Sequence, residues 1–461
     1  MSDRKSAAVV LAAGKGTRMK SARPKVLHRI AGREMVCHVL DRLAEMALDR
    51  CVVVVGAGAQ DVSAAVAPTP TVVQDPPQGT ADAVLAARPY LTGFDGDVLI
   101  LCGDTPLITA RTLTRMLETL RSAAGPAVVV LGFRPGDPAE YGRMITGAGG
   151  ALEAIVEHRD ASEDQRAIGL CNAGVMAVDG RHLLSLLEAV GCDNAKGEYY
   201  LTDIVGIARG RGLACAVCAI DDAEEVMGIN GRAELAVAEA AVQRRLRAAA
   251  MAEGATLLDP DSVYFSHDTV LGRDVVVGPH VVFGPGVSVG DRVEILSFCH
   301  FKDATIADDA IVGPFARLRP GARIGPAVRI GNFVEIKASV IERGAKVNHL
   351  SYIGDTRIGA KANVGAGTIT CNYDGFFKSH TEIGAGAFIG SNTSLVAPVS
   401  IGPGAFTGAG SVITEDVPAD ALAVERTKVT VKDGWAERFR KRRRAQKEAT
   451  RSPASAHRKE G

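Results

Sequence analysis

The C-terminal half of this 461-residue chain carries a repeat of six residues, and this repeat limits the possible folds more than any other feature. From Leu271-Gly272 onward, an aliphatic residue, often followed by Gly, recurs at every sixth position as far as residue 413. An α-helix repeats every 3.6 residues and an ordinary strand every 2, so neither explains a period of six. Stacked coils of three short strands do explain it. We therefore predict a parallel β-helix, in which each Gly lets the backbone turn without a Cβ atom.

The repeat is interrupted in places. It slips by one residue at Ile306, at Ile341 and at Ile358, and residues 371–382 separate it from a last regular run that begins at Ile383. An insertion into a regular solenoid has no packing purpose, and such insertions often fold over a binding site. We expect residues 371–382 to form a functional loop.

The composition of the whole chain fits a globular protein of two or three domains, with 47% hydrophobic and 23% charged residues. No apolar run approaches the roughly 18 residues of a membrane span, and no secretory segment opens the chain, so we expect a cytoplasmic protein without a membrane partner. Nine cysteines spread over the chain do not form a disulfide framework. Cys215 and Cys218 fall in a strand-like run, where they would face opposite sides, so we predict two separate thiols.

Positive charge is concentrated at the C-terminal end. Residues 425–461 hold 13 Lys and Arg against 5 Asp and Glu, although the net charge of the chain is zero. We predict a partly disordered, solvated basic tail. Nucleic-acid binding is a weaker alternative because no aromatic residues are interleaved with the charges, and we expect no nucleic-acid partner.

The N-terminal half alternates apolar strand-like runs with helical segments, as in an α/β domain. Residues 7–11, 51–55 and 98–101 are continuous apolar runs, typical of strands covered on both faces. The first run leads into AAGKGTRM at residues 12–19, which is either a Gly-rich phosphate-binding loop or a plain turn. Its spacing matches neither a dinucleotide-binding motif nor a P-loop.

Asp104 follows the third of these runs, where an open α/β sheet binds its ligands. A carboxylate at this position suits Mg²⁺, which prefers oxygen ligands and accompanies nucleotide phosphates. The alternative is that Asp104 caps the N-terminus of the next helix. Further along, residues 231–254 are rich in Ala, Glu and Arg with helical spacing and contain no Pro, which predicts a linking helix.

Several short motifs together resemble those of the sugar-phosphate nucleotidyltransferases. They are LAAGKGTRM at residues 11–19, PKVL at 24–27, Gln74 with Gly79 and Thr80, GD at 103–104, YGR at 141–143, IVEH at 155–158 and GEYYLTD at 197–203. With the six-residue repeat and CNYDG at 371–375, nearly all of residues 5–435 is similar to one bacterial family. Its members combine an N-acetylglucosamine-1-phosphate uridylyltransferase with a glucosamine-1-phosphate N-acetyltransferase.

The resemblance implies a fold and a division into domains. The fold would be an α/β, Rossmann-like nucleotidyltransferase domain followed by a left-handed parallel β-helix of hexapeptide repeats. Residues 1–230 would form the uridylyltransferase (pyrophosphorylase) domain, residues 231–254 the linker helix, and residues 255–461 the acetyltransferase domain with its basic tail. Because the family forms trimers, the resemblance also implies a homotrimer.

The resemblance further implies two reactions that supply UDP-N-acetylglucosamine for peptidoglycan and lipopolysaccharide precursors. Acetyl transfer from acetyl-CoA to glucosamine 1-phosphate would precede uridylyl transfer from UTP to N-acetylglucosamine 1-phosphate, which releases pyrophosphate. Positioning and charge neutralisation would carry the second reaction. The residues implied to bind UTP or the UDP-sugar are Leu11, Ala12, Ala13, Gly14, Arg18, Lys25, Gln74, Gly79, Thr80, Cys102, Gly103, Asp104, Gly142, Glu157, Asn172 and Asn230. Asp104 and Asn230 would also bind Mg²⁺.

For the acetyl transfer, the resemblance assigns His349 as the general base that takes a proton from the glucosamine amine. An imidazole can be neutral at working pH, and a positioned base typically contributes on the order of 10² to 10⁴ in rate. The residues implied to hold the sugar phosphate are Arg319, Lys337, Tyr352, Asn363 and Lys378, and those implied to contact acetyl-CoA are Ala366, Asn372, Tyr373, Ser391, Ala409 and Arg426. Cys371 is disfavoured as a nucleophile because no Cys-His-acid arrangement is evident in the sequence.

The sequence departs from the family's usual pattern at five positions. Cys102 replaces Tyr, Asp82 replaces His, Ala173 replaces Thr, Asn348 replaces Gly and Phe377 replaces Asn. The resemblance implies that Cys102, Asp82 and Ala173 line or neighbour the nucleotide-sugar pocket. Two other interpretations compete with the bifunctional enzyme. One is a uridylyltransferase whose coil serves only for oligomerisation, and the retention of His349 with its companions argues against it. The other is a non-enzymatic scaffold, which conflicts with the Gly-rich loop and Asp104.

Overall fold

The computed structural model describes residues 4–14 and 16–449. The chain divides into two compact units, residues 1–338 and residues 339–461. Lys15 of the Gly-rich loop and the end of the basic tail after residue 449 lie outside the described residues.

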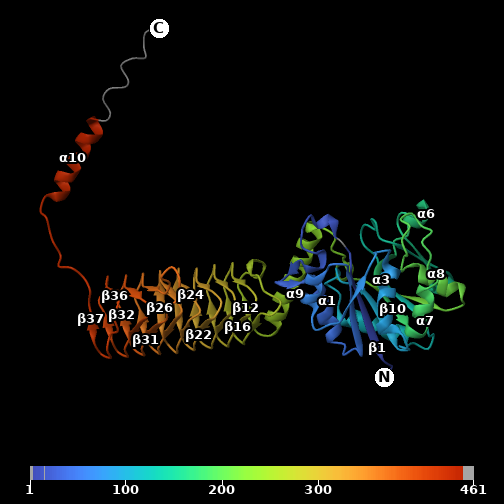
Figure 1. Ribbon diagram of the computed structural model, residues 1–461, viewed down its shortest axis with the longest axis horizontal. Helices are drawn as coiled ribbons and strands as arrows, with labels where there is room; N and C mark the ends of the chain where they lie inside the picture. The colour runs from blue at the N-terminus through green and yellow to red at the C-terminus, as the bar shows by residue number, and fades with distance from the viewer. Residues whose placement is uncertain (1–3, 15, 450–461) are drawn as a thin grey trace, which may run out of the picture. The chain divides into compact units, whose positions relative to one another are not determined.

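The first unit begins with a mixed β-sheet that has helices on both faces (Figure 1). β1 (Ser6–Ala12) runs parallel to its two neighbours, β4 (Arg50–Gly56) and β6 (Asp97–Cys102). The three predicted buried strands are therefore confirmed, and burial on both faces explains their continuous apolar sequence. The order across the sheet is β11-β7-β10-β6-β1-β4-β5, and β10 runs antiparallel to both of its neighbours. The strands not yet given are β5 (Thr71–Gln74), β7 (Val128–Phe133), β10 (Cys171–Asp179) and β11 (Cys215–Ile220). In addition, β8 (Arg143–Thr146) pairs with β10 and with β9 (Leu152–Val156).

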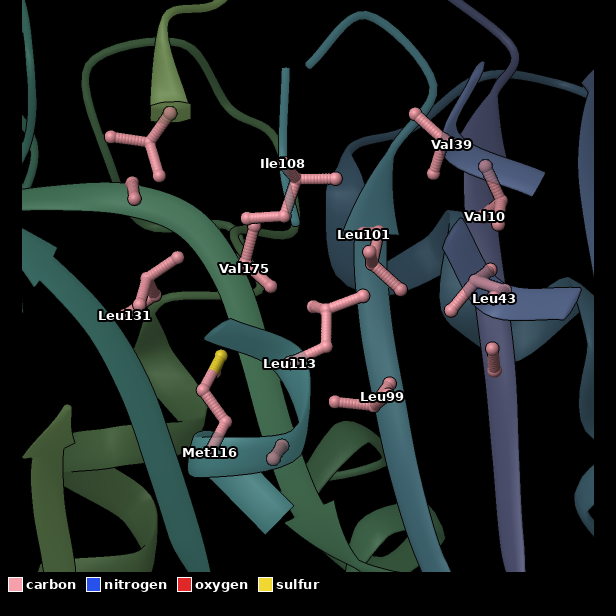
Figure 2. Packing of buried hydrophobic residues seen from close by; sticks show 14 of the residues in the cluster. Val10, Val39, Leu43, Leu99, Leu101, Ile108, Leu113, Met116, Leu131 and Val175 are labelled. Atoms are coloured by element: carbon pink, nitrogen blue, oxygen red, sulfur yellow. The ribbon is translucent and has the colours of Figure 1, made fainter. Parts of the chain in front are cut away.

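Alternate residues of each central strand pack into separate cores on the two faces of this sheet. Figure 2 shows Leu99 and Leu101 of β6 beside Leu113 and Met116 of α5 (Ala110–Leu120) in one core. Val98 and Ile100 of the same strand belong to the opposite core. The first core is also covered by α1 (Met35–Ala44) and α2 (Gln60–Val66), and the second by α3 (Thr80–Ala86), α4 (Arg88–Leu91), α7 (Gly180–Leu187) and α8 (Asp203–Gly210). Two small elements lie outside these cores, the hairpin of β2 (Arg29–Ile30) with β3 (Arg33–Glu34) and the helix α6 (Glu163–Arg166).

The two neighbouring cysteines of β11 illustrate the alternation. Cys215 packs into the core beneath α8, whereas Cys218 packs into the core beneath α5. Both thiols are free. The prediction of two separate thiols is confirmed, because the period of two along a strand directs residues i and i+3 to opposite faces.

The predicted linking helix is α9 (Arg232–Ala252). Its buried Gln243 exchanges two hydrogen bonds with the backbone of Phe265, donating to the carbonyl at 2.7 Å and accepting from the N–H at 2.8 Å. Glu239 accepts a hydrogen bond from the N–H of Ala31 at 2.8 Å. The helix is thus fixed on one side to the sheet domain and on the other to the start of the repeat region, which limits rotation about this connection.

The repeat region of the first unit forms a parallel β-helix of three sheets, as predicted. From β13 onward in this unit, successive strands contribute to the three sheets in turn, so every third strand lies in the same sheet. One sheet contains β12 (Thr256–Leu257), β14 (Val276–Val277), β17 (Glu294–Ile295), β20 (Ile311–Val312) and β23 (Arg329–Asn332); the second β13 (Val270–Leu271), β16 (Val287–Val289), β19 (Ala304–Ile306) and β22 (Ala322–Ile324); and the third β15 (Val282–Phe283), β18 (His300–Phe301), β21 (Arg317–Leu318) and β24 (Glu335–Lys337).

The aliphatic residues of the repeat point into the centre of the coils. Phe283 lies opposite Phe301 in the next coil, and both side chains are buried. Val289 lies opposite Ile306, one residue earlier than the six-residue period would place it. The slip therefore shortens one coil by a residue while its aliphatic side chain remains inside.

The glycines that follow these aliphatic residues serve a different purpose from the one predicted. A Cβ atom at Gly272 would lie 2.5 Å from the backbone carbon of Gly290 in the next coil, so this Gly permits close stacking of the coils. The left-handed turn positions come later in each coil and are filled by other residues, among them Asp274 and Phe298, with φ of 57° and 62°. The expectation that the Gly provides the turn was wrong.

The second unit, from residue 339, continues the same three-sheet pattern. Its sheets contain β26 (Lys346–His349), β29 (Asn363–Val364), β32 (Phe388–Ile389), β35 (Phe406–Thr407) and β37 (Leu422–Ala423); β25 (Val340–Ile341), β28 (Thr356–Ile358), β31 (Thr381–Ile383) and β34 (Val399–Ile401); and β27 (Tyr352–Gly354), β30 (Ile369–Cys371), β33 (Ser394–Val396) and β36 (Val412–Ile413). The interrupting segment lies between β30 and β31, and Thr356 pairs with Thr381 across it. The loop therefore leaves the stacking of the coils intact.

The basic tail contains a helix that the sequence prediction did not include. α10 (Trp435–Ala449) carries most of the tail's positive charge, and all its charged side chains are exposed. Trp435 stacks on Phe439 one turn later, with ring centroids 5.1 Å apart, and Arg443 lies over the Phe439 ring. These contacts within one helix face favour helix over coil despite the charge repulsion. The expectation that no aromatic residues are interleaved with the charges of the tail was wrong, because Trp435 and Phe439 lie among them.

Candidate active sites

A cavity of about 480 Å³ opens at the carboxyl ends of β1, β5 and β6. Parallel strands of open α/β sheets bind ligands at this edge. Ten of the predicted nucleotide-binding residues line the cavity: Leu11, Ala12, Ala13, Gly14, Lys25, Gln74, Gly79, Thr80, Cys102 and Asp104. The structure thus brings together residues that lie as far as 93 positions apart in the sequence, from Leu11 to Asp104.

The Gly-rich loop is held against Lys25. Gly16 has a left-handed φ of 58°, and a Cβ atom there would lie 2.4 Å from the Cβ of Lys25, so only Gly fits. Arg18, in the short 3₁₀ helix η1 (Thr17–Met19), is exposed and does not line the cavity. Gly103 lies behind the cavity wall, where its N–H donates to the carbonyl of Leu11 at 2.9 Å.

Lys25 and Asp104 line this cavity, and Asn230 lies beside them without lining it. The Lys25 ammonium forms an ion pair with the Asp104 carboxylate, and its Nζ lies 3.4 Å from Oδ1 of Asn230. The N–H of Ile229 donates to the Asp104 carbonyl at 3.0 Å, which fixes Asn230 beside Asp104. Two oxygen donors therefore already face a positive charge. This donor set fits Mg²⁺, which is held by few protein oxygens together with phosphates and water.

Asp104 does not cap a helix, so that alternative is wrong. The helix after it, α5, begins at Ala110, and its N-terminal cap is Thr109, whose hydroxyl accepts from the N–H of Thr112 at 3.2 Å. Glu225 reinforces this cap by accepting from the N–H and hydroxyl of Thr109 at 2.9 and 2.8 Å. The Asp104 carboxylate remains available to the cavity.

Gly142, Glu157 and Asn172, which were predicted to bind the UDP-sugar, form a second group. The N–H of Asn172 donates to the Gly142 carbonyl at 2.9 Å, and a Cβ atom at Gly142 would lie 3.5 Å from both carboxylate oxygens of Glu157. Oδ1 of Asn172 accepts from the N–H of Gly174 at 2.9 Å, and Gly174 in turn contacts Cys102 on the cavity wall. The sugar group and the nucleotide cavity are therefore contiguous.

Burial raises the pKa of Glu157, and a hydrogen bond from the Thr202 hydroxyl, at 3.2 Å, partly offsets this effect. Burial also raises the pKa of the Cys102 thiol to about 12, with the Asp104 carboxylate adding to the effect. Cys102 is thus a neutral thiol that shapes the cavity and cannot act as a thiolate nucleophile at neutral pH.

Two supporting residues of this site were not predicted. Glu198 lines the cavity, and Thr202 donates to Glu157. Asp82, expected to lie at or near the pocket, accepts from Gln74 at 2.7 Å, and its role in holding Gln74 was not foreseen. Glu198 and Thr202 fall within the GEYYLTD motif at residues 197–203, so that motif was the available signal.

In the first unit, the β-helix residues predicted for the sugar phosphate are Arg319 and Lys337. The Arg319 guanidinium donates to Glu335 at 2.7 Å, and Arg317 lies 3.5 Å from the other oxygen of the same carboxylate. Lys337 is the last residue of β24, two positions after Glu335. Glu335 balances this positive cluster and was not predicted.

In the second unit, Tyr352, Gly354 and Asn372 lie against one another. A Cβ atom at Gly354 would lie 2.6 Å from the Tyr352 hydroxyl and 2.7 Å from Nδ2 of Asn372, and Asn372 also hydrogen-bonds the Asp355 carboxylate. His349 ends β26 with its side chain exposed, and its carbonyl accepts from the Ser351 hydroxyl at 2.8 Å. Asn363 begins the next strand of that sheet, β29.

The interrupting loop forms a small bridge of its own. Tyr373 pairs with Lys378 in an antiparallel bridge, which places these two predicted ligand residues on opposite sides of the loop. Phe376 and Phe377 at its tip are 85% and 76% exposed, an unusual position for two large apolar side chains.

The residues predicted to contact acetyl-CoA include a column of small residues on successive coils. The Ala366 carbonyl accepts from the N–H of Asn392, next to Ser391, at 2.7 Å, and the Ser391 carbonyl accepts from the N–H of Gly410, next to Ala409, at 2.8 Å. The structure therefore aligns Ala366, Ser391 and Ala409 on successive coils. Arg426 is exposed beyond the last strand, β37, and is not part of the column.

Fold and site together define a transferase that joins a nucleotidyltransferase domain to a hexapeptide β-helix. Residues 8–192 match the MobA-like NTP transferase domain, and residues 303–338 and 380–415 match the bacterial transferase hexapeptide (six repeats). The chain is 65% identical over 436 residues, 95% of its length and 97% of the relative's, to the bifunctional protein GlmU of Rhodospirillum rubrum. It is 61% identical over 97% of its length and 99% of the relative's to the same-named protein of Paramagnetospirillum magneticum. The chain belongs to this family of bifunctional GlmU proteins. None of the helices in residues 4–449, Lys15 aside, is both long and apolar enough to cross a membrane.

Proposed function

We propose that the chain catalyses two successive transfers that produce UDP-N-acetylglucosamine. The β-helix transfers an acetyl group from acetyl-CoA to glucosamine 1-phosphate, and the sheet domain then transfers a uridylyl group from UTP to the product. The observation that carries this proposal is the pairing of Lys25 with Asp104 on the wall of a nucleotide-sized cavity, with Asn230 beside them, in a member of the bifunctional family. In this assignment residues 1–230 perform uridylyl transfer, residues 231–254 link the domains, and residues 255–461 perform acetyl transfer.

In the uridylyl transfer, a phosphate oxygen of N-acetylglucosamine 1-phosphate attacks the α-phosphorus of UTP, and pyrophosphate leaves. The Gly-rich loop and Lys25 hold the phosphates, while Gly142, Glu157 and Asn172 orient the sugar. Mg²⁺, held by Asp104 and Asn230, would supply charge neutralisation at the phosphates. Since no covalent intermediate forms, the residues act by positioning and electrostatics.

In the acetyl transfer, the amine nitrogen of glucosamine 1-phosphate attacks the thioester carbonyl of acetyl-CoA, and the CoA thiol leaves. His349 accepts the proton that the amine loses. Arg319, Lys337 and Lys378 hold the sugar phosphate, and Tyr352 and Asn363 contact the sugar. The coenzyme lies along the column of Ala366, Ser391 and Ala409, with Asn372, Tyr373 and Arg426 as further contacts.

We further propose that the protein acts in the cytoplasm as a homotrimer. The hexapeptide β-helix supports this assembly, because its coils leave exposed flanks that further copies of the chain can cover. Sedimentation of the full chain at micromolar concentration tests this, and a stable monomer would contradict it.

The function is tested by supplying glucosamine 1-phosphate, acetyl-CoA, UTP and Mg²⁺ together, and measuring free CoA thiol and pyrophosphate in the same tube. We expect both products, with pyrophosphate release depending on acetyl-CoA. Pyrophosphate formed only from acetylated sugar phosphate, with no thiol released, would leave the β-helix a structural module.

A further inference from the structure

Gln74 stands at the point where the nucleotide cavity meets the end of β5. Its side chain is 5% exposed and lines the cavity, and its backbone pairs with Gly56 of β4. Because both its strand and its burial fix the side chain, only the direction of the terminal amide can vary. That direction decides whether the cavity offers a hydrogen-bond donor or an acceptor.

Both protons of the Gln74 amide nitrogen are committed within the protein. Nε2 donates to the Gly79 carbonyl at 2.9 Å and to Oδ2 of Asp82 at 2.7 Å. A carbonyl and an ionised carboxylate can only accept, so the amide cannot be reversed without losing two hydrogen bonds, one of them to a charged group. The same Asp82 oxygen lies 3.4 Å from the backbone nitrogen of Gln78, which ties it to the loop between β5 and α3.

The Gln74 carbonyl oxygen is therefore the atom left for a ligand. Within the described residues it accepts no hydrogen bond, yet it is not among the sealed polar atoms that lack a partner, so it is reachable from the cavity. A free acceptor selects a ligand edge that carries an N–H. Uracil has an N–H at its ring position N3, whereas cytosine has a lone pair there and would face the oxygen with repulsion.

We propose that Asp82 is a positioning residue that sets the nucleobase preference of the cavity by locking the Gln74 amide with its carbonyl oxygen toward the ligand. The inference rests on the proposed use of a nucleoside triphosphate in this cavity. It adds that the preference for uracil over cytosine depends on a residue outside the cavity wall.

The test measures nucleotide discrimination in the full chain with Asp82→Asn and Asp82→Ala. Asp82→Asn keeps the shape of the side chain, but its amide N–H can donate a hydrogen bond, so the Gln74 amide can flip. Asp82→Ala removes the acceptor of the Gln74 hydrogen bond. Binding of UDP and CDP is measured by calorimetry, and kcat/KM is measured with UTP and CTP. Asp61→Asn, at an exposed position on α2, is the matched control for the loss of one charge.

We expect the unmodified chain to bind UDP more tightly than CDP. In both Asp82 variants, the ratio of the affinity for UDP to that for CDP should fall by about tenfold, because this corresponds to the difference in strength between a charged and a neutral hydrogen bond. The Asp61 variant should keep the original ratio. An unchanged ratio in both Asp82 variants, or equal binding of UDP and CDP by the unmodified chain, would overturn the proposal. If no nucleotide yields pyrophosphate but the binding ratio narrows as expected, the orientation by Asp82 stands and the proposed uridylyl transfer fails.

Discussion

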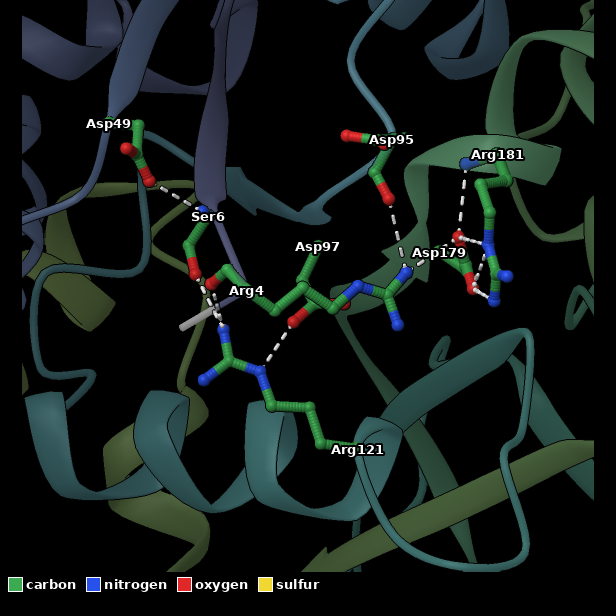
Figure 3. A network of polar contacts seen from close by, with 8 residues as sticks. All are labelled: Arg4, Ser6, Asp49, Asp95, Asp97, Arg121, Asp179 and Arg181. Carbon is green, nitrogen blue, oxygen red and sulfur yellow. Dashed lines mark hydrogen bonds and ion pairs between the residues drawn. The ribbon is translucent and has the colours of Figure 1, made fainter. Parts of the chain in front are cut away.

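The Nε of Arg121 lies 2.5 Å from Oδ2 of Asp97, and this Asp97 side chain at the start of β6 is completely buried (Figure 3). Arg121 also donates to the Ser6 hydroxyl at 2.7 Å, and Arg4 approaches the other Asp97 oxygen at 3.0 Å. Arg4 continues the network to Asp179 at 2.7 Å. These residues tie the N-terminal ends of β1 and β6 to the end of β10, at the edge of the sheet opposite the nucleotide cavity.

Removing Arg121 from this network should destabilise the sheet domain. Arg121→Met leaves a buried carboxylate with one cation in place of two, and we expect the free energy of unfolding to fall by about 2–4 kcal/mol. Arg88→Met is the control, because Arg88 and Glu188 are each about half exposed and such pairs contribute under about 1 kcal/mol. Urea unfolding followed by circular dichroism measures the free energy of unfolding of each variant. Equal losses of this free energy in Arg121→Met and Arg88→Met would mean that the burial of Asp97 does not increase the contribution of its ion pair to stability.

The two proposed active sites should fail independently. Asp104→Ala removes an oxygen donor beside Lys25, so pyrophosphate release should fall at least 10²-fold while release of CoA thiol is unchanged. His349→Ala should lower the kcat of acetyl transfer by about 10² to 10⁴, with little change in KM. Each reaction is measured separately with its own sugar phosphate. Loss of both reactions in either folded variant would contradict the assignment of two sites.

The pH dependence of sugar binding should respond to Thr202. Burial raises the pKa of Glu157, and the Thr202 hydrogen bond counteracts part of that rise by stabilising the carboxylate. Thr202→Val removes the hydrogen bond, so the pKa should rise further, and the acidic limb of the KM profile for N-acetylglucosamine 1-phosphate should move to higher pH. The phosphate of the substrate also titrates, but equally for both proteins. Glu157→Gln should lose the part of the acidic limb that depends on this carboxyl group. An acidic limb that does not shift in Thr202→Val would refute the effect of Thr202 on the pKa of Glu157.

Close stacking of the coils predicts a large effect of a single methyl group. Gly272→Ala would place a Cβ atom 2.5 Å from the Gly290 backbone, and we expect about 1–3 kcal/mol of destabilisation. Gly136→Ala is the control, because a Cβ atom there meets nothing within 4 Å. Thermal unfolding of the two variants measures the difference. A normal melting temperature for Gly272→Ala would show that the coils can separate freely.

The fold was predictable from the sequence where the pattern is periodic. The inward positions of Phe283, Phe301 and Ile306 follow from the six-residue repeat, including its slip, because each coil must place an apolar side chain in the same corner. The reason for the Gly after each aliphatic residue was not predictable, because it depends on the distance to the next coil. The helix α10 was missed because composition alone does not reveal the stacking of Trp435 on Phe439.

Prediction of the candidate sites depended on motif resemblance. Lys25, Asp104 and Asn230 lie far apart in the chain, and no spacing rule would join them. Residues that orient the predicted ones, such as Thr202 and Glu335, were missed because their partners come from other strands or helices. For the same reason, the hydrogen bond from Gln74 to Asp82 was not predicted, although Asp82 was expected near the pocket. Sequence reasoning finds the groups that meet the substrate more readily than the groups that hold them in place.

The loop between β30 and β31 is added at a corner of the coil, and the pairing of Thr356 with Thr381 continues past it as if it were absent. Buried Asn372 ties the base of the loop to Asp355, whereas residues 373–378 are exposed and can change in length and sequence at little cost to the surrounding stack. A scaffold of this kind can keep its coils unchanged while the loop at this corner changes. The same architecture can therefore acquire specificity for different acyl donors or acceptors.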